Sequence, residues 1–108
     1  MGIVSTATGA QLAVVNTEHS LSQKTGVGIY VLVVDTSAMD TGDVLELRVK
    51  TKCVAGGSVK LAYLASFADA QEEPHKYSVP VPIDSEIICT LKQTAGTGRT
   101  FPWNLLRA

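Results

Sequence analysis

The stretch that decides the fold class is VLELRVKTKCV, residues 44–54. Its side chains alternate along the chain, with Leu45, Leu47 and Val49 on one side and Glu46, Arg48 and Lys50 on the other. A period of two is typical of an antiparallel strand that packs one face on a core and leaves the other in water. The sequence AGGS that follows (55–58) predicts a hairpin turn, because Gly-Gly tolerates positive φ angles.

The strand expected before it, at about Val27 to Asp35, is apolar on both faces. Its two sets of side chains are Val27, Ile29, Val31 and Val33 on one side, and Tyr30, Leu32 and Val34 on the other. A strand with two apolar faces is covered on both sides. We therefore expect one face to meet the core, and the other to meet a loop, the N-terminal arm or another subunit.

Similar patterns predict the remaining strands, at about residues 11–21, 59–67, 85–94 and 99–106. Turn residues separate them, and for the glycine-rich sequence GTGR (96–99) we expect a hairpin turn rather than a phosphate-binding loop, since both flanks are strands. Residues 1–10 are small and polar apart from Ile3 and Val4, and are expected to form a flexible N-terminal arm, with an edge strand as the alternative. The single domain then spans residues 11–108.

Prolines predict where the sheets end. The segment YSVPVP (77–82) is expected to be an extended edge strand, which Pro80 and Pro82 protect from further pairing because neither can donate to a ladder. Pro102 likewise restricts the last strand to an edge or to an irregular stretch.

The fold class that follows is all-β: an antiparallel β-sandwich of jelly-roll or Greek-key type with seven or eight strands. An up-and-down barrel is the second choice. The length of 108 residues suits one domain with a real core. No window has the sustained spacing of apolar residues that an amphipathic helix needs.

Charge and hydropathy exclude two classes of partner. Lys and Arg total 9 and Asp and Glu total 10, so there is no basic excess to neutralise a nucleic acid backbone. The longest apolar run, Ile29 to Val34, has only the length of a strand, so we predict no membrane span and no secretion signal.

The residues that carry chemistry do not form a recognisable site, so we predict no catalytic residue, no cofactor and no metal. Zinc ligands usually come in close pairs, whereas the candidates are spread over His19, Cys53, His75 and Cys89. Both cysteines fall in predicted strands and are expected to be buried free thiols. The loop aspartates 35, 40 and 43 could bind calcium, but their spacing is not that of an EF-hand, and turn formation and strand capping are the expected roles.

Three stretches together carry a resemblance: residues 30–35 through 42–49, then YSVPVP (77–82), then LKQTAGTGR (91–99) with FPW (101–103). They resemble a group of small virion proteins of tailed bacteriophages and prophages. The resemblance implies a non-enzymatic structural protein, for which we expect the role of a capsid decoration (cement) protein. Two alternatives stay open: a tail or head-to-tail connector component, and a carbohydrate-binding host-recognition module that uses Tyr77 and Trp103.

The resemblance also implies partners and a location. The partners are the major capsid protein or other virion proteins, and further copies of the chain, with a trimer expected. The location is the virion, after assembly in the host cytoplasm. The expected interface residues are Ile3, Val4, Tyr77, Pro80, Pro82, Phe101, Pro102 and Trp103. Deleting residues 1–10 is then expected to weaken particle binding and to leave the isolated fold intact.

Overall fold

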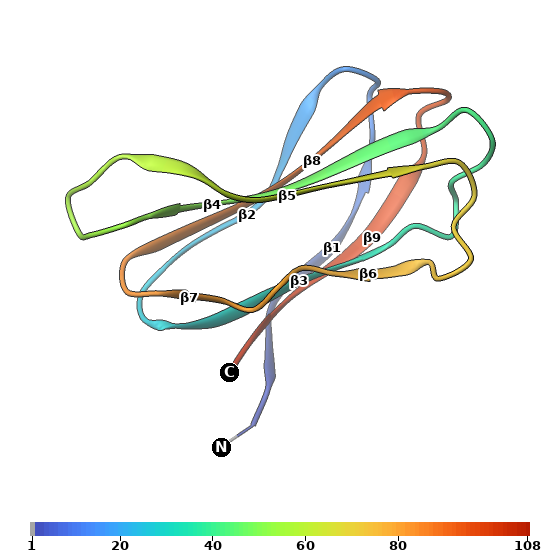
Figure 1. Cartoon of the computed structure of the whole chain (residues 1–108). Coiled ribbons are helices and arrows are strands. Elements are labelled where there is room, and N and C mark those ends of the chain that lie inside the picture. Colours follow the sequence, from blue (N-terminus) through green and yellow to red (C-terminus); the bar gives the residue numbers. More distant parts are fainter. Residues whose placement is uncertain (1) are drawn as a thin grey trace.

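The structure, a computed structural model, describes residues 2–108 and consists of two antiparallel sheets packed face to face (Figure 1). Sheet A has the order β1 (Val4–Leu12), β9 (Thr100–Arg107), β3 (Gly28–Asp35), and on the far side of β3 the two short strands β6 (His75–Tyr77) and β7 (Val81–Ile83). Sheet B has the order β2 (Glu18–Thr25), β8 (Glu86–Ala95), β4 (Val44–Lys52), β5 (Val59–Ala68). The prediction of an all-β sandwich is confirmed, but residues 2–108 form nine strands where seven or eight were expected, because the segment with Pro80 and Pro82 gives two short strands.

Most connections pass from one sheet to the other. The hairpin β4–β5, turning through residues 53–58, links two strands that pair with each other, as predicted. Elsewhere, β1 leads to β2, β2 to β3, and β8 to β9, each across the sandwich. The turn at 95–98 therefore joins the two sheets, and the expectation of a hairpin there is wrong.

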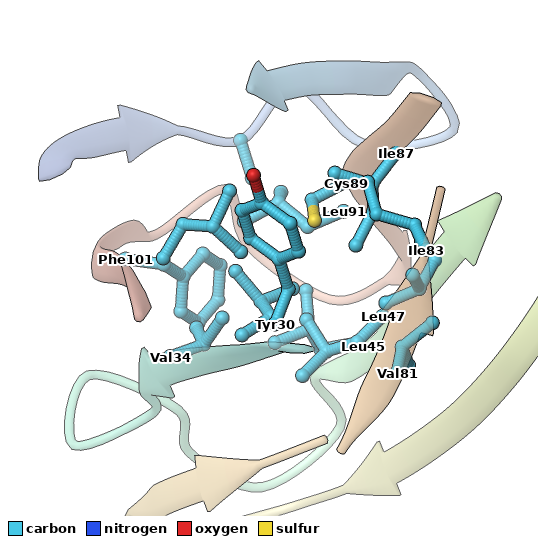
Figure 2. Packing of buried hydrophobic residues seen from close by; sticks show 14 of the residues in the cluster. Tyr30, Val34, Leu45, Leu47, Val81, Ile83, Ile87, Cys89, Leu91 and Phe101 are labelled. Atoms are coloured by element: carbon cyan, nitrogen blue, oxygen red, sulfur yellow. The ribbon is translucent and has the colours of Figure 1, made fainter. Parts of the chain in front are cut away.

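The core lies between the inner faces of the sheets. Tyr30, Leu32 and Val34 of β3 point inward, as predicted. The inward side chains of β4 are also those predicted: Leu45, Leu47 and Val49. Figure 2 shows these side chains converging with those of β7, β8 and β9. Large apolar side chains buried in this way stabilise a fold by about 1.5–3 kcal/mol each.

Residues 4–12 form strand β1 at the edge of sheet A, so the expectation of a flexible arm is wrong for residues 4–10 and the alternative of an edge strand is confirmed there; Met1 lies outside the described residues. The strand expected at 11–21 is wrong as well, because the chain leaves sheet A after Leu12 and turns at Asn16, whose φ is 67°. The small residues of β1 have a packing reason. A Cβ atom on Gly9 would lie 3.2 Å from Nε1 of Trp103, so the chain stays small where this ring packs.

Strand β9 lies inside sheet A, between β1 and β3, and not at an edge as Pro102 suggested. The last pair of the β3–β9 ladder joins Val34 and Trp103, so Pro102 lies one residue beyond it. On its other side Pro102 is opposite Ala10 of β1. Proline is thus tolerated because one of the two ladders has already ended where it occurs.

Candidate interaction surface

The outer face of sheet A is apolar over β3, β6, β7 and the end of β9, whereas Asn104 and Thr8 make it polar toward β1. The cross-strand pairs Ile29–Pro82, Val31–Leu106 and Val33–Tyr77 join apolar residues of β3 to apolar residues of β7, β9 and β6. Directly opposed residues of an antiparallel pair lie on the same face, and this face is opposite the one that packs on the core. We call the surface formed by these six residues, together with Ile3 and Pro80, the apolar face.

A hollow of about 300 Å³ opens on the apolar face. Its walls are Ile3, Ile29, Val31, Tyr77, Pro80, Leu106, Arg107 and Ala108. The C-terminal residue is held there by backbone hydrogen bonds in both directions with Ile29, at 2.9 Å from the Ala108 nitrogen and 3.4 Å to the Ala108 oxygen. Arg107 is the one charged residue of the lining, and it is opposite the inward residue Tyr30 in the ladder, so its side chain belongs to the other face of sheet A. A partner that enters this hollow is therefore recognised mainly by apolar contact.

The outer face of sheet B has the opposite character. Glu18 of β2 accepts hydrogen bonds from Lys50 Nζ at 2.7 Å, from Arg48 Nη1 at 3.2 Å and from the Thr90 hydroxyl at 2.7 Å. The bond from Lys50 is the main reason why the pKa of Glu18 lies below its usual range. Arg48 also pairs with Glu46, at 2.8 Å. These charges satisfy one another across three strands and leave a hydrated surface.

Of the eight residues predicted for an interface, the structure brings five together on or beside the apolar face. Ile3, Tyr77 and Pro80 line the hollow, and Pro82 lies opposite Ile29. Pro102 is exposed further along β9.

The remaining three predicted residues lie elsewhere. Val4 is half exposed at the start of β1, opposite Arg107. Phe101 has no exposed surface and belongs to the core, so its inclusion in an interface is wrong. Trp103 is half-buried and packs against the core from the inner face. Its neighbour across the ladder is Val34, an inward residue.

Tyr77 and Trp103 do not form a platform for a sugar. Tyr77 is opposite Val33 and Trp103 is opposite Val34, and consecutive residues of a strand point to opposite faces. The two rings therefore lie on opposite faces of sheet A.

Sequence reasoning missed part of this surface. Ile29, Val31 and Leu106, which line the hollow, were not named among the expected interface residues, although the outer side of the strand at 27–35 and the segment 101–106 were expected to contact another part of the chain or another subunit. The signal for the first two was the apolar outer side of the strand at 27–35. For Leu106, it was the alternation that sends Leu105 inward and hence its neighbour outward.

The loop aspartates are structural. The Asp43 carboxylate accepts the N–H groups of Asp40 at 2.9 Å and Thr97 at 3.0 Å, and the Nε–H of Arg99 at 2.8 Å. Asp35 accepts the N–H of Ser37 at 2.9 Å, as a turn-forming aspartate does. In residues 2–108, no three His, Cys, Asp or Glu side chains are grouped so that they could hold a metal ion.

The two histidines and the two cysteines lie apart from one another in the structure. His19 Nε2 accepts the N–H of Val14 at 3.0 Å and so ties the β1–β2 connection to β2. Cys89 lies in the core, as predicted, and burial raises the pKa of its thiol to about 12. Cys53 lies in the β4–β5 turn and is exposed, so the prediction that it is buried is wrong.

The described part of the chain contains no helix with the length and apolar character required to cross a membrane. No protein-family model, curated protein or solved structure matches this chain.

Proposed function

We propose that this chain is a non-enzymatic structural subunit of a tailed-phage virion, a capsid decoration protein that docks through the apolar face of sheet A. The observation that carries the proposal is the contrast between the two outer faces of the sandwich. The outer face of sheet B carries charges that pair with one another, and the outer face of sheet A carries the apolar face with a hollow in it. Contiguous apolar patches on a soluble domain mark surfaces that another molecule covers.

The chemistry of the apolar face suits a shell better than a substrate. Its residues are carbon-rich and carry few hydrogen-bonding groups, so they can stabilise a contact but cannot polarise or protonate a bound molecule. Burying such side chains is worth about 25 cal/mol per Å². A shell repeats this contact at every equivalent site, so a modest area per copy suffices for a stable coat.

The connectivity also supports the proposal. If β6 and β7 are counted as one interrupted strand along β3, the strands in chain order form sheets 1-8-3-6 and 2-7-4-5. We infer that this is the jelly-roll form of the sandwich, an architecture used by many virion proteins and also by lectins. One fold serves many functions, so the apolar face supports the proposal more strongly than the connectivity does.

The test is particle binding. Phage heads prepared without the protein are incubated with the wild type or with Ile29→Lys, and occupancy is measured by cryo-electron microscopy and quantitative mass spectrometry. We expect the charge at Ile29 to reduce occupancy at least tenfold. Val54→Lys is the matched control, since Val54 is exposed in the β4–β5 turn, away from the apolar face, and it should bind like the wild type. Equal occupancy of the Ile29 variant and the wild type would refute docking through this face.

The same experiment separates the alternative virion roles. Density on tails or at the head-to-tail junction, with none on the shell, would reassign the protein to a tail or connector component.

A further inference from the structure

The sandwich has four strand edges, and three of them offer little to a further strand. β6 and β7 have three residues each, and Pro80 and Pro82 cannot donate to a ladder. β2 carries charges near both ends, at Glu18 and Lys24. β1 consists mainly of small and polar residues, so pairing with it would bury little apolar surface. Shortness, proline and charge are common protections of natural sheet edges.

Strand β5 is less protected than these three edges, because one lysine and one bulge are its protections. It has ten residues, contains no proline and no acidic residue, and has Lys60 as its one charge. One side of β5 pairs with β4, and within residues 2–108 no strand pairs with the other side. Figure 1 shows the β4–β5 hairpin reaching past the ends of the other strands, with β5 at the border of sheet B. An edge of this kind can accept a strand from another chain.

Two leucines reinforce the edge. Leu61 is opposite Lys50 and Leu64 is opposite Arg48, so both leucines lie on the outer face of sheet B. They share that face although they are three residues apart, because the ladder has a bulge between Val49 and Lys50. Leu61 is 51% exposed and Leu64 is 50% exposed. The outer face of sheet B is otherwise charged, so these side chains mark its border as apolar.

We propose that two copies of this chain pair antiparallel through β5 about a two-fold axis. A second copy is the partner that fits, because an antiparallel pair of identical strands is self-complementary about such an axis. With the axis between Ala62 and Tyr63, each Leu61 lies opposite the Leu64 of the other copy. Lys60 then lies opposite Ala65, so no like charges oppose each other. The two four-stranded sheets become one continuous sheet. This contact is separate from the apolar face of sheet A and does not depend on the virion role.

The test is the mass of the full chain in solution, measured by light scattering after size exclusion. We expect the wild type to be a dimer that dissociates on dilution, and a variant with Leu61→Lys and Leu64→Lys to be a monomer. Both positions are half exposed, so the variant should keep the circular dichroism and melting temperature of the wild type. Leu12→Lys is the matched control, because Leu12 is a 60% exposed leucine on the edge strand β1. It should remain a dimer.

A rescue experiment tests the register. The lysine variant is mixed with a variant carrying Leu61→Glu and Leu64→Glu, which places a cation opposite an anion at both pairs. We expect the mixture to form heterodimers, and amide hydrogen exchange in residues 59–68 to slow when they form. A wild type that is monomeric or trimeric, a lysine variant that stays dimeric, a mixture that stays monomeric, or loss of the dimer with Leu12→Lys would each overturn the proposal. None of these results bears on particle binding by Ile29→Lys.

Discussion

Asp43 is the residue at which two connections of the sandwich meet. Its side chain is 1% exposed and accepts hydrogen bonds from the loop before β4, at Asp40, and from the turn before β9, at Thr97 and Arg99. Gly96 completes the arrangement: its φ is +89°, and a Cβ atom there would lie 2.1 Å from the Asp43 Oδ1 atom. The carboxylate and the glycine therefore depend on each other.

Replacing the carboxylate by an amide tests this arrangement. We expect Asp43→Asn to lower the free energy of unfolding by about 2–4 kcal/mol, because a buried ion pair with Arg99 is broken and an N–H group is left poorly satisfied. Urea unfolding at neutral pH measures this change. A loss below about 0.5 kcal/mol would show that the charge of the carboxylate contributes little to the stability of the fold.

The same residue makes stability depend on pH. Burial tends to raise the pKa of Asp43, but the hydrogen bonds from Asp40, Thr97 and Arg99 together outweigh it and hold the pKa below its usual range. The unfolded chain therefore binds this proton first, so the contribution is complete above about pH 4 and is lost as the pH falls through the folded-state pKa. Glu18 and Asp35 shift in the same direction. We expect urea unfolding of wild type and Asp43→Asn to converge between neutral pH and pH 3, and a constant difference would exclude this role.

The two thiols differ in accessibility and in acidity. Cys53 is exposed, whereas Cys89 is buried with its pKa raised to about 12, so it supplies almost no thiolate near neutral pH. We expect an aromatic disulfide reagent to titrate one thiol per native chain and two after denaturation. Cys53→Ser should abolish the native reaction. Fast reaction of both thiols in the native state would show that the core opens around β8.

At the scale of the element, β1 is the strand whose role differs most from the expectation. It pairs with β9 from Val4 to Leu12, and Gly9 lies against the ring of Trp103. Removing it would uncover this ring and the adjacent part of the core. We therefore no longer expect the isolated fold to stay intact when residues 1–10 are deleted; the deletion should destabilise it.

We expect a chain without residues 2–12 to lose at least about 3 kcal/mol of stability, the scale of exposing one or two large apolar side chains. Trp103 is the one tryptophan of the chain, so its emission should shift to the red. The control is removal of residues 2–3, which precede β1 and should leave the emission and the melting temperature unchanged. An unshifted spectrum in the long deletion would mean that β9 is protected in another way.

At the scale of the whole molecule, the inner and outer residues of β3 are both apolar, but we expect them to contribute differently to the stability of the fold. Leu32 of β3 points into the core and is 1% exposed, whereas Ile29 of the same strand points outward and is 47% exposed. We expect Leu32→Ala to lower the free energy of unfolding by about 2–5 kcal/mol, and Ile29→Lys to change it by less than about 0.5 kcal/mol. Urea unfolding of the two variants measures both. A large loss with Ile29→Lys would mean that the apolar face supports the fold of the isolated domain.

Much of the fold follows from local patterns. The alternation of Leu45, Leu47 and Val49 correctly predicted a strand and its buried face, and the two apolar sides of β3 correctly predicted apolar residues on its outer side. Part of the interaction surface followed as well, through Ile3, Tyr77 and Pro80.

Other features have no local signal. The composition of residues 4–12 does not distinguish a flexible arm from an edge strand, because the strand depends on pairing with β9, which is distant in the chain. The exposure of Cys53 depends on where the β4–β5 ladder ends, and the burial of Phe101 depends on β9 lying inside the sheet.

The sequence alone determined most of the extended segments after residue 26 and which of their sides are apolar, because a strand places its side chains with a period of two whatever its partner is. Only the tertiary structure decided which strands pair, that β9 lies between β1 and β3, and that the outer residues of four strands meet in one apolar face. The physical reason is that strand pairing joins residues far apart in the chain, so its free energy depends on packing between the sheets and not on neighbours in sequence.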